Sequence, residues 1–362
     1  FLADFLGKKF IGNFGLIFSL FGYVLLIIAS ILPENFYTLL IGLGIVLFGL
    51  GTAMNMGNWF ALLHPIIPEK IRGRFFGRLR LTWQSIGIVL TLFFIYMLEQ
   101  FPYLRMYQTV LVIVSIFLAV RILFYQHIPE LEKPVPPKES FLKTLMNVIA
   151  IPDYISFCSY CFLLIFFTTA CPQIFSLIEK DVLSFTKTEI VFIGNLLIVG
   201  ALAGFVLGGR MVDKLGTKYV FMFCHFGFGA IIILFLLRSL LPGKIIVIVG
   251  ILTLLFGLVQ ASSGIAMTSE TLVLIPKENK SLAIGLWLTL INAGAGLSGI
   301  ISSTFLELNL INPEWSLFGL QMSRYDGLLL MFGTMVLLMT VTLGLIPSMV
   351  KKAPAAWIPQ ST

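Results

Sequence analysis

LGGRMVDKLGTK, residues 207–218, is the stretch that decides the fold, because a shorter copy opens the chain as LADFLGKK, residues 2–9. In both copies an aspartate stands three residues before a glycine, and a lysine stands two residues after that glycine. The matched pairs are Asp4 and Asp213, Gly7 and Gly216, and Lys9 and Lys218, each at an offset of 209 residues. Because both copies lie between long apolar stretches, the pattern indicates one charged turn used twice between hydrophobic segments.

A second pair of segments repeats at almost the same distance. IPEKIRGRFFG begins at Ile67 and IPKENKSLAIG begins at Ile275, an offset of 208 residues. Two different features that recur at nearly one offset predict an internal duplication. Parallel repeats of this kind build transporters in which two halves rock about a central site.

The composition indicates an integral membrane protein. The 362 residues are 58% hydrophobic and 11% charged, with a mean hydropathy of +1.01, whereas soluble domains carry about 25% charged residues. The net charge of +7 therefore does not indicate a nucleic-acid partner. The four cysteines lie in apolar stretches and predict no disulfide framework.

A membrane-spanning helix needs about 20 apolar residues, and the chain offers ten such stretches. The predicted spans are 11–31, 36–60, 81–98, 107–125, 154–178, 188–208, 219–240, 244–268, 282–305 and 326–346. Lipid gives the backbone no hydrogen-bond partner, so every span is predicted to be helical and the fold to be all-α. Residues 126–153, rich in proline and charge, predict a linker between an N-terminal bundle (1–125) and a C-terminal bundle (154–346), followed by a tail (347–362).

The basic residues predict the orientation. With alternating spans, 18 of the 24 lysines and arginines fall on one side, and cytoplasmic loops carry the excess of Lys and Arg. The motif turns, the linker and the C-terminus are therefore expected to be cytoplasmic in a multi-pass protein of the plasma (cytoplasmic or inner) membrane.

The motifs resemble those of the major facilitator superfamily (MFS). LGGRMVDKLGTK is similar to the family's signature loop between spans two and three, LADFLGKK to its N-half counterpart, and IPEKIRGRFFG to the loop between spans four and five. The resemblance implies two pseudo-symmetric helical bundles in which the chain supplies the last ten of twelve spans. It also implies that the first two spans, roughly 55–60 residues, are missing.

The resemblance also implies a gate at the cytoplasmic face. In family members the acid of the loop contacts the start of a helix in the other half. Asp4 would then face the helix start near Lys280–Leu282, and Asp213 the one near Arg74–Arg80. The alternative is that these charges only fix the topology. The expected gating residues are Asp4, Gly7, Lys8, Lys9, Gly209, Arg210, Asp213, Gly216, Lys218, Arg72, Gly73 and Arg74.

The centres of the predicted spans hold no Asp, Glu, Lys or Arg, which favours a neutral or zwitterionic solute. Neutral polar residues are therefore the candidates to line a substrate cavity, with Asn292 and Gln260 the strongest by depth. The others are Ser263, Asn195, Thr168, Thr169, Gln173, Asn55, Asn58, Trp59, Trp83 and Gln84. The alternative for each is an interhelical hydrogen bond or a packing contact, and His225 is expected to be hydrogen-bonded or to snorkel rather than to bind solute.

We therefore expect a secondary active or facilitative transporter of a small solute that works by rocker-switch alternating access. The alternative is a non-transporting receptor or assembly factor with the same fold. The family's drug–proton antiporters carry an arginine in one span and a proline in the next. Here GLGIVLFGLGTAM (42–54) has no arginine and WQSIGIVLTLFF (83–94) has no proline, which disfavours a drug–proton antiporter. No enzyme activity and no cofactor are expected, since nucleotide-binding and metalloprotease motifs are absent. The expected partners are a solute and membrane lipid, and a coupling proton or sodium ion stays an open question. The protein is expected to be a monomer.

Overall fold

The computed structural model describes residues 1–32, 34–101, 103–134, 139–276, 278–310, 312, 314–317 and 319–345. The predicted tail at 347–362 lies outside the described residues. Contacts divide the chain into two units. Unit 1 comprises Phe1–Pro68, Gln84–Ala150 and Ile275–Leu286, and unit 2 comprises Glu69–Trp83, Ile151–Leu274 and Trp287–Thr362. Each unit thus takes one short segment from across the predicted linker, and the bundle boundaries 1–125 and 154–346 stay a prediction.

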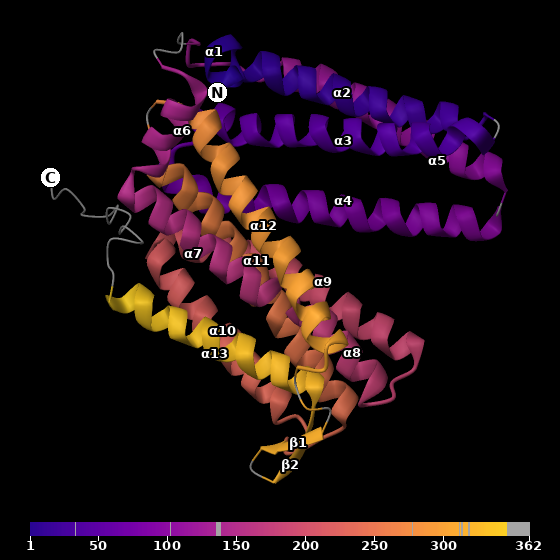
Figure 1. Cartoon of the computed structure of the whole chain (residues 1–362), viewed down its shortest axis with the longest axis vertical. Helices are drawn as coiled ribbons and strands as arrows, with labels where there is room; N and C mark the ends of the chain where they lie inside the picture. Colours follow the sequence, from indigo (N-terminus) through magenta and orange to yellow (C-terminus); the bar gives the residue numbers. More distant parts are fainter. Residues whose placement is uncertain are drawn as a thin grey trace, which may run out of the picture. The chain divides into compact units, whose positions relative to one another are not determined.

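Helices make up almost the whole described chain (Figure 1). The first half holds α1 (Leu2–Leu6), α2 (Lys8–Ala29), α3 (Glu34–Leu63), the 3-10 turn η1 (Glu69–Ile71), α4 (Arg72–Gln100), α5 (Leu104–Gln126) and α6 (Phe141–Ile149). The second half holds α7 (Pro152–Thr169), α8 (Cys171–Asp181), α9 (Lys187–Leu215), α10 (Thr217–Leu236), α11 (Ile245–Leu274), α12 (Lys280–Glu307) and α13 (Arg324–Leu345).

Nine candidate membrane spans occur in the described part of the chain, and each overlaps one of the first nine predicted spans, although the third begins at Glu69 rather than at residue 81. The tenth prediction, 326–346, corresponds to α13, except that residue 346 is not described. The fifth predicted span is divided into α7 and α8 at Ala170. Pro172 explains the break, since proline lacks an N–H and its ring clashes with the preceding helical turn.

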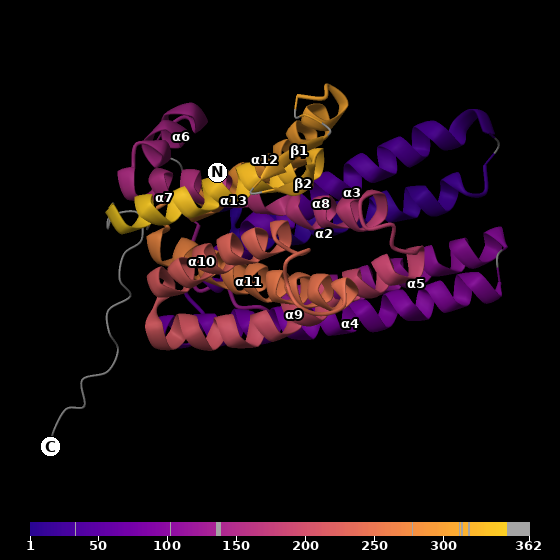
Figure 2. The ribbon, with the colours of Figure 1, turned by 90° about the horizontal axis from the view of Figure 1, so that it is seen from below.

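In unit 1, α2 and α3 pack side by side (Figures 1 and 2), and α5 packs on α2. Their common core contains Leu16, Leu62, Ile122 and Tyr125. In unit 2, stacked aromatic rings join α8, α10 and α11: the Phe175 and Phe235 ring centroids are 4.2 Å apart, and Phe256 lies edge-on to Phe175 at 5.2 Å.

Several short elements were not predicted, among them α1 and η1 beside the motif segments. The linker contains α6, and a hairpin of β1 (Glu314–Leu317) and β2 (Leu320–Ser323) precedes α13 (Figure 1). The hairpin is tied down locally: the Trp315 indole N–H donates to the Ser323 carbonyl at 2.9 Å, and the Ser323 N–H donates to Asp326 at 2.9 Å.

Candidate functional site

The C-half copy of the motif ends α9 and contacts the start of α4, and all of its atoms belong to unit 2. The Asp213 carboxylate accepts hydrogen bonds from the backbone N–H groups of Gly73 at 2.8 Å and Arg74 at 3.0 Å. The Arg74 side chain adds a third bond through Nε at 2.8 Å. The first N–H groups of a helix have no partner within that helix and carry partial positive charge. Asp213 therefore satisfies the N-terminus of a helix that comes from the other sequence half.

Glycine is required where α4 and α9 meet. A Cβ atom on Gly73 would lie 2.5 Å from the carbonyl oxygen of Gly209 and 2.7 Å from Asp213 Oδ1. A Cβ on Gly209 would lie 2.6 Å from the carbonyl oxygen of Gly73. No side chain fits at such distances, so the predicted gating residues Gly73 and Gly209 permit the approach that brings Asp213 to the helix end.

The N-half copy repeats this arrangement within unit 1. The Asp4 carboxylate accepts from the backbone N–H groups of Ser281 at 3.1 Å and Leu282 at 3.3 Å, at the start of α12. Ser281 and Leu282 are the residues 208 positions after Gly73 and Arg74. Both aspartates thus bind equivalent N–H groups, as the family resemblance implied.

The turns themselves are shorter than the motif suggested. Asp4 lies in α1 and Asp213 in the last turn of α9, so neither aspartate is in the loop, and that part of the interpretation was wrong. The chain turns at Gly7, with φ of 108°, and at Gly216, with φ of 85°, and the next helix begins at once. These positive φ values explain why both positions hold glycine.

A cation at the first position of each helix makes a second matched contact. Buried Arg72 donates from Nη1 to the carbonyl oxygen of Leu272 at 3.3 Å and lies 3.6 Å from Glu69. Its counterpart 208 residues later, Lys280, lies with Nζ 3.3 Å from Nδ1 of His64, and His64 is the counterpart of Leu272. Both cations therefore reach the end of the helix that precedes the loop in the other half.

Glu132, which follows α5, joins two lysines in unit 1. It accepts from Lys8 Nζ at 2.5 Å and from Lys280 Nζ, while Glu130 accepts from the backbone N–H of Lys8 at 2.7 Å. Burial raises the pKa of Glu132, but the hydrogen bonds and charges of Lys280 and Lys8 outweigh burial and hold that pKa below its usual value. Sequence reasoning missed both glutamates, although HIPELEKP, residues 127–134, places them just after a predicted span.

The remaining predicted gating cations have no such role in this structure. Within the described residues, no ion pair involves Lys9, Arg210 or Lys218. Arg210 is exposed, and the other two are half-buried. Their expected contribution to a gate stays a prediction.

The structure divides the predicted cavity residues of unit 2 into exposed and internally bonded ones. Asn292 is exposed, and its amide donates to the carbonyl of Leu288 at 2.8 Å, whereas buried Ser263 donates to the carbonyl of Gln260 at 2.9 Å. Buried Thr168 donates to the carbonyl of Leu164 at 2.7 Å. Of the others, Asn195, Gln173 and Trp83 are exposed, and Gln260 and Thr169 are half-buried.

The candidates in unit 1 mostly contact other residues of that unit. Asn55 is buried, accepts from Arg121 Nη2 at 2.7 Å and donates to the carbonyl of Gly12 at 3.3 Å. Asn58 is also buried and donates to the carbonyl of Met54 at 2.7 Å. Trp59 packs its ring 6.1 Å from that of Tyr125, and Gln84 is exposed. Asn55 and Asn58 therefore fit the packing alternative better than solute binding.

One strongly polar contact escaped sequence reasoning. Arg80, just before the predicted span 81–98, donates from Nη2 to Thr268 Oγ1 of α11 at 2.7 Å, within unit 2. A Cβ on Gly264 would lie 2.7 Å from Arg80 Nη1, so glycine makes room for the guanidinium.

Among the described residues, no group of three or more His, Cys, Asp or Glu is arranged to hold a metal ion.

His225 of α10 is fully buried and joins α10 to α7 and α13. Its Nδ1 donates to the carbonyl of Val336 at 3.1 Å, which leaves Nε2 to accept from the Tyr160 hydroxyl at 2.7 Å. This is the hydrogen-bonded histidine that the sequence favoured over a solute ligand.

Comparisons with known proteins relate the fold of this chain to solved transporter structures. The chain is similar to the fucose:proton symporter of E. coli, with a TM-score of 0.71 and 14% identity over 94% of this chain and 85% of that one. It is similar to a bacterial homologue of the iron transporter ferroportin in an outward-facing state, with a TM-score of 0.66 and 16% identity over 96% and 88%. A human organic anion transporter gives a TM-score of 0.70 and 14% identity over 92% and 78%. No curated protein sequence matches the chain.

At these identities the structural likeness shows the fold alone, and it confirms the predicted all-α MFS-type architecture. The family itself follows from the sequence, since a sequence model of the Major Facilitator Superfamily matches residues 1–299. The chain belongs to the Major Facilitator Superfamily.

Proposed function

We propose that this protein moves a small solute across the plasma membrane by rocker-switch alternating access. In this proposal the two aspartate–helix contacts are latches that hold the cytoplasmic side closed. The observation that carries the proposal is the matched pair of contacts, Asp213 with Gly73 and Arg74, and Asp4 with Ser281 and Leu282. Each contact joins segments from opposite sides of the predicted linker, so each must break if the cytoplasmic side is to open.

The chemistry of the contacts suits a latch. A carboxylate on backbone N–H groups makes charge-assisted hydrogen bonds, which are stronger than neutral ones. Yet the Arg74 side chain is 53% exposed, so water can replace its bond when the helices separate. An interaction of this kind holds one conformation without making the other inaccessible.

The solute is proposed to be neutral or zwitterionic, with a proton or sodium ion as candidate coupling ions. The named neighbours carry fucose, iron and organic anions, which is too wide a range to choose a substrate. The two motif turns, the linker and the tail are proposed to be cytoplasmic. The protein is proposed to be a monomer without enzymatic activity.

The test is solute uptake by proteoliposomes that contain the full chain. A panel of radiolabelled sugars, amino acids and organic acids should include at least one solute that accumulates faster than in empty liposomes. Imposed proton and sodium gradients then show whether uptake is coupled to either ion. A solute that binds to the protein in detergent but never enters the liposomes would instead favour a receptor.

A further inference from the structure

Three acids are buried in the part of the chain that the structure describes, and their surroundings differ. Asp326 is paired with Arg238, and Glu270 accepts a hydrogen bond from the Thr217 hydroxyl. Glu179, near the end of α8, is 1% exposed. Its Oε2 atom is buried without a hydrogen-bond partner among the described residues, and no ion pair found there includes it. Glu179 is therefore a buried acid that the contacts described above do not explain.

The surroundings of Glu179 are apolar. It lies on the buried face of α8 together with Ile174, Phe175 and Ile178, and Phe175 stacks on Phe235 of α10 with the ring centroids 4.2 Å apart. The helices that pack on α8 include α7, α9 and α13, which all belong to unit 2, so the contacts around Glu179 lie within one unit. A carboxylate in such a place would lose its hydration with no donor or cation to replace it, so the group keeps its proton instead.

The charged groups nearby have other partners or face water. The helices α8 and α10 end on the side of unit 2 on which α9, α11 and α13 begin. The charged or titratable residues at these ends are Lys180, Asp181, Lys187, Glu189, Arg238, Lys244, Arg324, Tyr325 and Asp326. Asp181 accepts from the Tyr325 hydroxyl at 2.6 Å, and Glu189 accepts from the backbone N–H of Thr186 at 2.8 Å. No ion pair within the described residues joins Glu179 to any of them.

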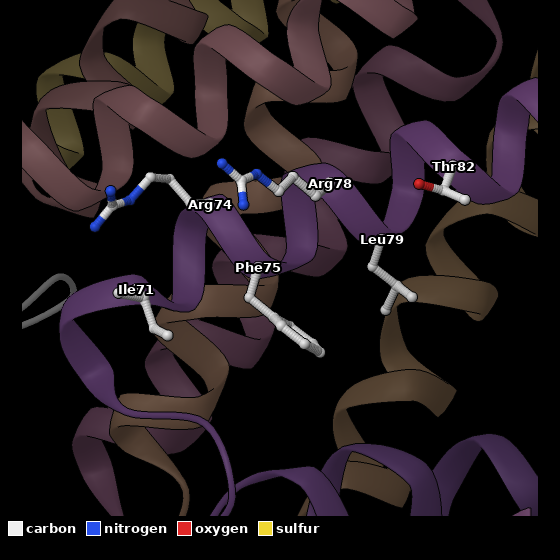
Figure 3. A pocket seen from close by; sticks show the side chains of 6 residues that line it. All are labelled: Ile71, Arg74, Phe75, Arg78, Leu79 and Thr82. Carbon is white, nitrogen blue, oxygen red and sulfur yellow. The ribbon is translucent and has the colours of Figure 1, made fainter.

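The hollow beside the first turns of α4 offers a cation no alternative site. Its volume is about 390 Å3, and its lining residues all lie in unit 2 (Figure 3). Arg74 and Arg78 are among the six residues that line it, and none of the six is acidic. Because two guanidinium groups repel a cation, this hollow is unsuited to a proton or a sodium ion.

We propose that Glu179 binds a coupling proton and holds it as a neutral carboxyl group while α8 is packed as in this structure. The assignment rests on the proposed transport function and names the ion that this function leaves open. A sodium ion needs several oxygen ligands, such as the carbonyls of unwound helix segments in other transporters, whereas a proton needs a single carboxyl group. Acids in membrane-spanning segments commonly serve as proton carriers.

The break before α8 provides a route for release of the proton. Pro172 separates α8 from α7 at Ala170, so α8 is a short helix that can move without the whole span. Movement that brings Glu179 to water lets the carboxyl group pass its proton to a water molecule and stay behind as a carboxylate. The reverse movement requires the carboxylate to take up one proton before it is buried again.

The protonation of Glu179 can be measured without any solute. Infrared spectra of the full chain in lipid vesicles at neutral pH would compare wild type with Glu179→Gln, because the C=O stretch of a neutral carboxyl group is separate from the bands of a carboxylate. The wild type should show a neutral carboxyl band that Glu179→Gln lacks. A difference spectrum that contains carboxylate bands and no such neutral band would overturn the proposal.

Glu307→Gln is the matched control, because Glu307 is exposed at the end of α12 and no ion pair within the described residues involves it. It should lose carboxylate bands and keep the neutral band. Glu179→Asp retains a carboxyl group and should show the neutral band at a shifted frequency, which provides the comparison if Glu179→Gln does not fold. A spectrum of Glu179→Asp with the neutral band unshifted would assign that band to another acid and overturn the proposal.

The coupling role is tested with a solute of the uptake panel that accumulates in proteoliposomes. An imposed proton gradient should speed uptake by the wild type several-fold and should have no effect on Glu179→Gln, while a sodium gradient should affect neither. Uptake driven by sodium, or an equal proton response in both proteins, would overturn the coupling role. If no solute of the panel enters the liposomes, the proposed function fails and the coupling role with it, whereas the infrared result on the proton of Glu179 stands by itself.

Discussion

The backbone N–H of Gly73 donates to the carboxylate of Asp213 over 2.8 Å, and the same relationship recurs between Ser281, 208 residues after Gly73, and Asp4, 209 residues before Asp213. In both contacts, a carboxylate on one helix thus accepts hydrogen bonds from the first N–H groups of another helix, and the atoms involved are equivalent. An arrangement that only fixed membrane topology would not need this match, because the positive-inside rule counts charges and ignores their partners.

Asp213→Asn should shift the protein toward the state that is open to the cytoplasm. The amide loses the charge on three hydrogen bonds, and bonds to charged groups contribute about 1.5–3 kcal/mol. The expected shift in the open-to-closed ratio is about tenfold or more. It can be measured by sided maleimide labelling of a single cysteine at Asn292, after replacement of the four native cysteines.

Glu278→Gln is the control for this shift. Glu278 is exposed and precedes α12, yet no ion pair within the described residues involves it. Labelling of Asp213→Asn that matches this control from both membrane faces would contradict the latch.

Gly73→Ala should separate α4 from α9. The added methyl would lie 2.5 Å from the carbonyl oxygen of Gly209, which is backbone and cannot rotate away. Overpacking of this kind costs typically about 1–3 kcal/mol, so we expect a lower unfolding temperature and faster cytoplasmic labelling.

Gly87→Ala provides the comparison in the same helix, because its Cβ would meet nothing within 4 Å. It should be neutral or slightly stabilising, since alanine favours a helix by up to about 1 kcal/mol over glycine. If both alanines had the same effect, close approach at Gly73 would not matter.

The contribution of Glu132 should depend on pH. Lys280 and Lys8 lower its pKa in the folded protein, although burial opposes them. Its stabilising effect is therefore fully present above the pKa of the unfolded chain, about 4.3. The effect is lost as the pH falls through the lower pKa of the folded protein. The difference in unfolding temperature between wild type and Glu132→Gln should be constant from neutral pH to about 5 and shrink below about 4.3.

Glu278→Gln again serves as the control for the loss of one carboxylate, because no ion pair within the described residues involves Glu278. A Glu132→Gln difference that grew on acidification would mean that the carboxylate is not held in its charged form.

The family resemblance implied the two aspartate contacts, and the repeated motif located the two acids and the two helix starts that make them. The sequence could not predict which face of each span is exposed. In a helix such as α3 nearly every residue is apolar. The sequence therefore shows how deep a residue lies along the span, but not whether its side chain points into the protein or away from it. Asn292 and Asn55 were therefore grouped as cavity candidates, although one is exposed and the other bonds to Arg121 and Gly12.

Contacts made by long side chains across the chain were equally hidden. Glu132 meets lysines 124 and 148 residues away, and nothing in the spacing of one linker glutamate selects those partners. The hairpin at 314–323 was missed for a different reason: Ser323 and Asp326 form a local Ser-x-x-Asp pattern at the start of α13, which marks a helix start but not the strands before it.

Removing one charge of the Arg238–Asp326 pair should lower the free energy of unfolding, whereas replacing both residues should restore most of it. The two side chains are 8% and 1% exposed, and Arg238 Nη1 lies 2.6 Å from Asp326 Oδ1. Asp326→Asn leaves a buried guanidinium without its counter-charge, which costs about 3–5 kcal/mol. The double variant Arg238→Met, Asp326→Leu removes both charges and should recover most of that loss in chemical unfolding. The solvent-exposed pair Lys143–Glu139, at 66% and 32%, is the control. Glu139→Gln there should leave the free energy of unfolding nearly unchanged, because water and salt screen a surface ion pair. A double variant no more stable than Asp326→Asn would show that the bonds from Asp326 to Ser323, rather than the ion pair, hold α13 and its hairpin in place.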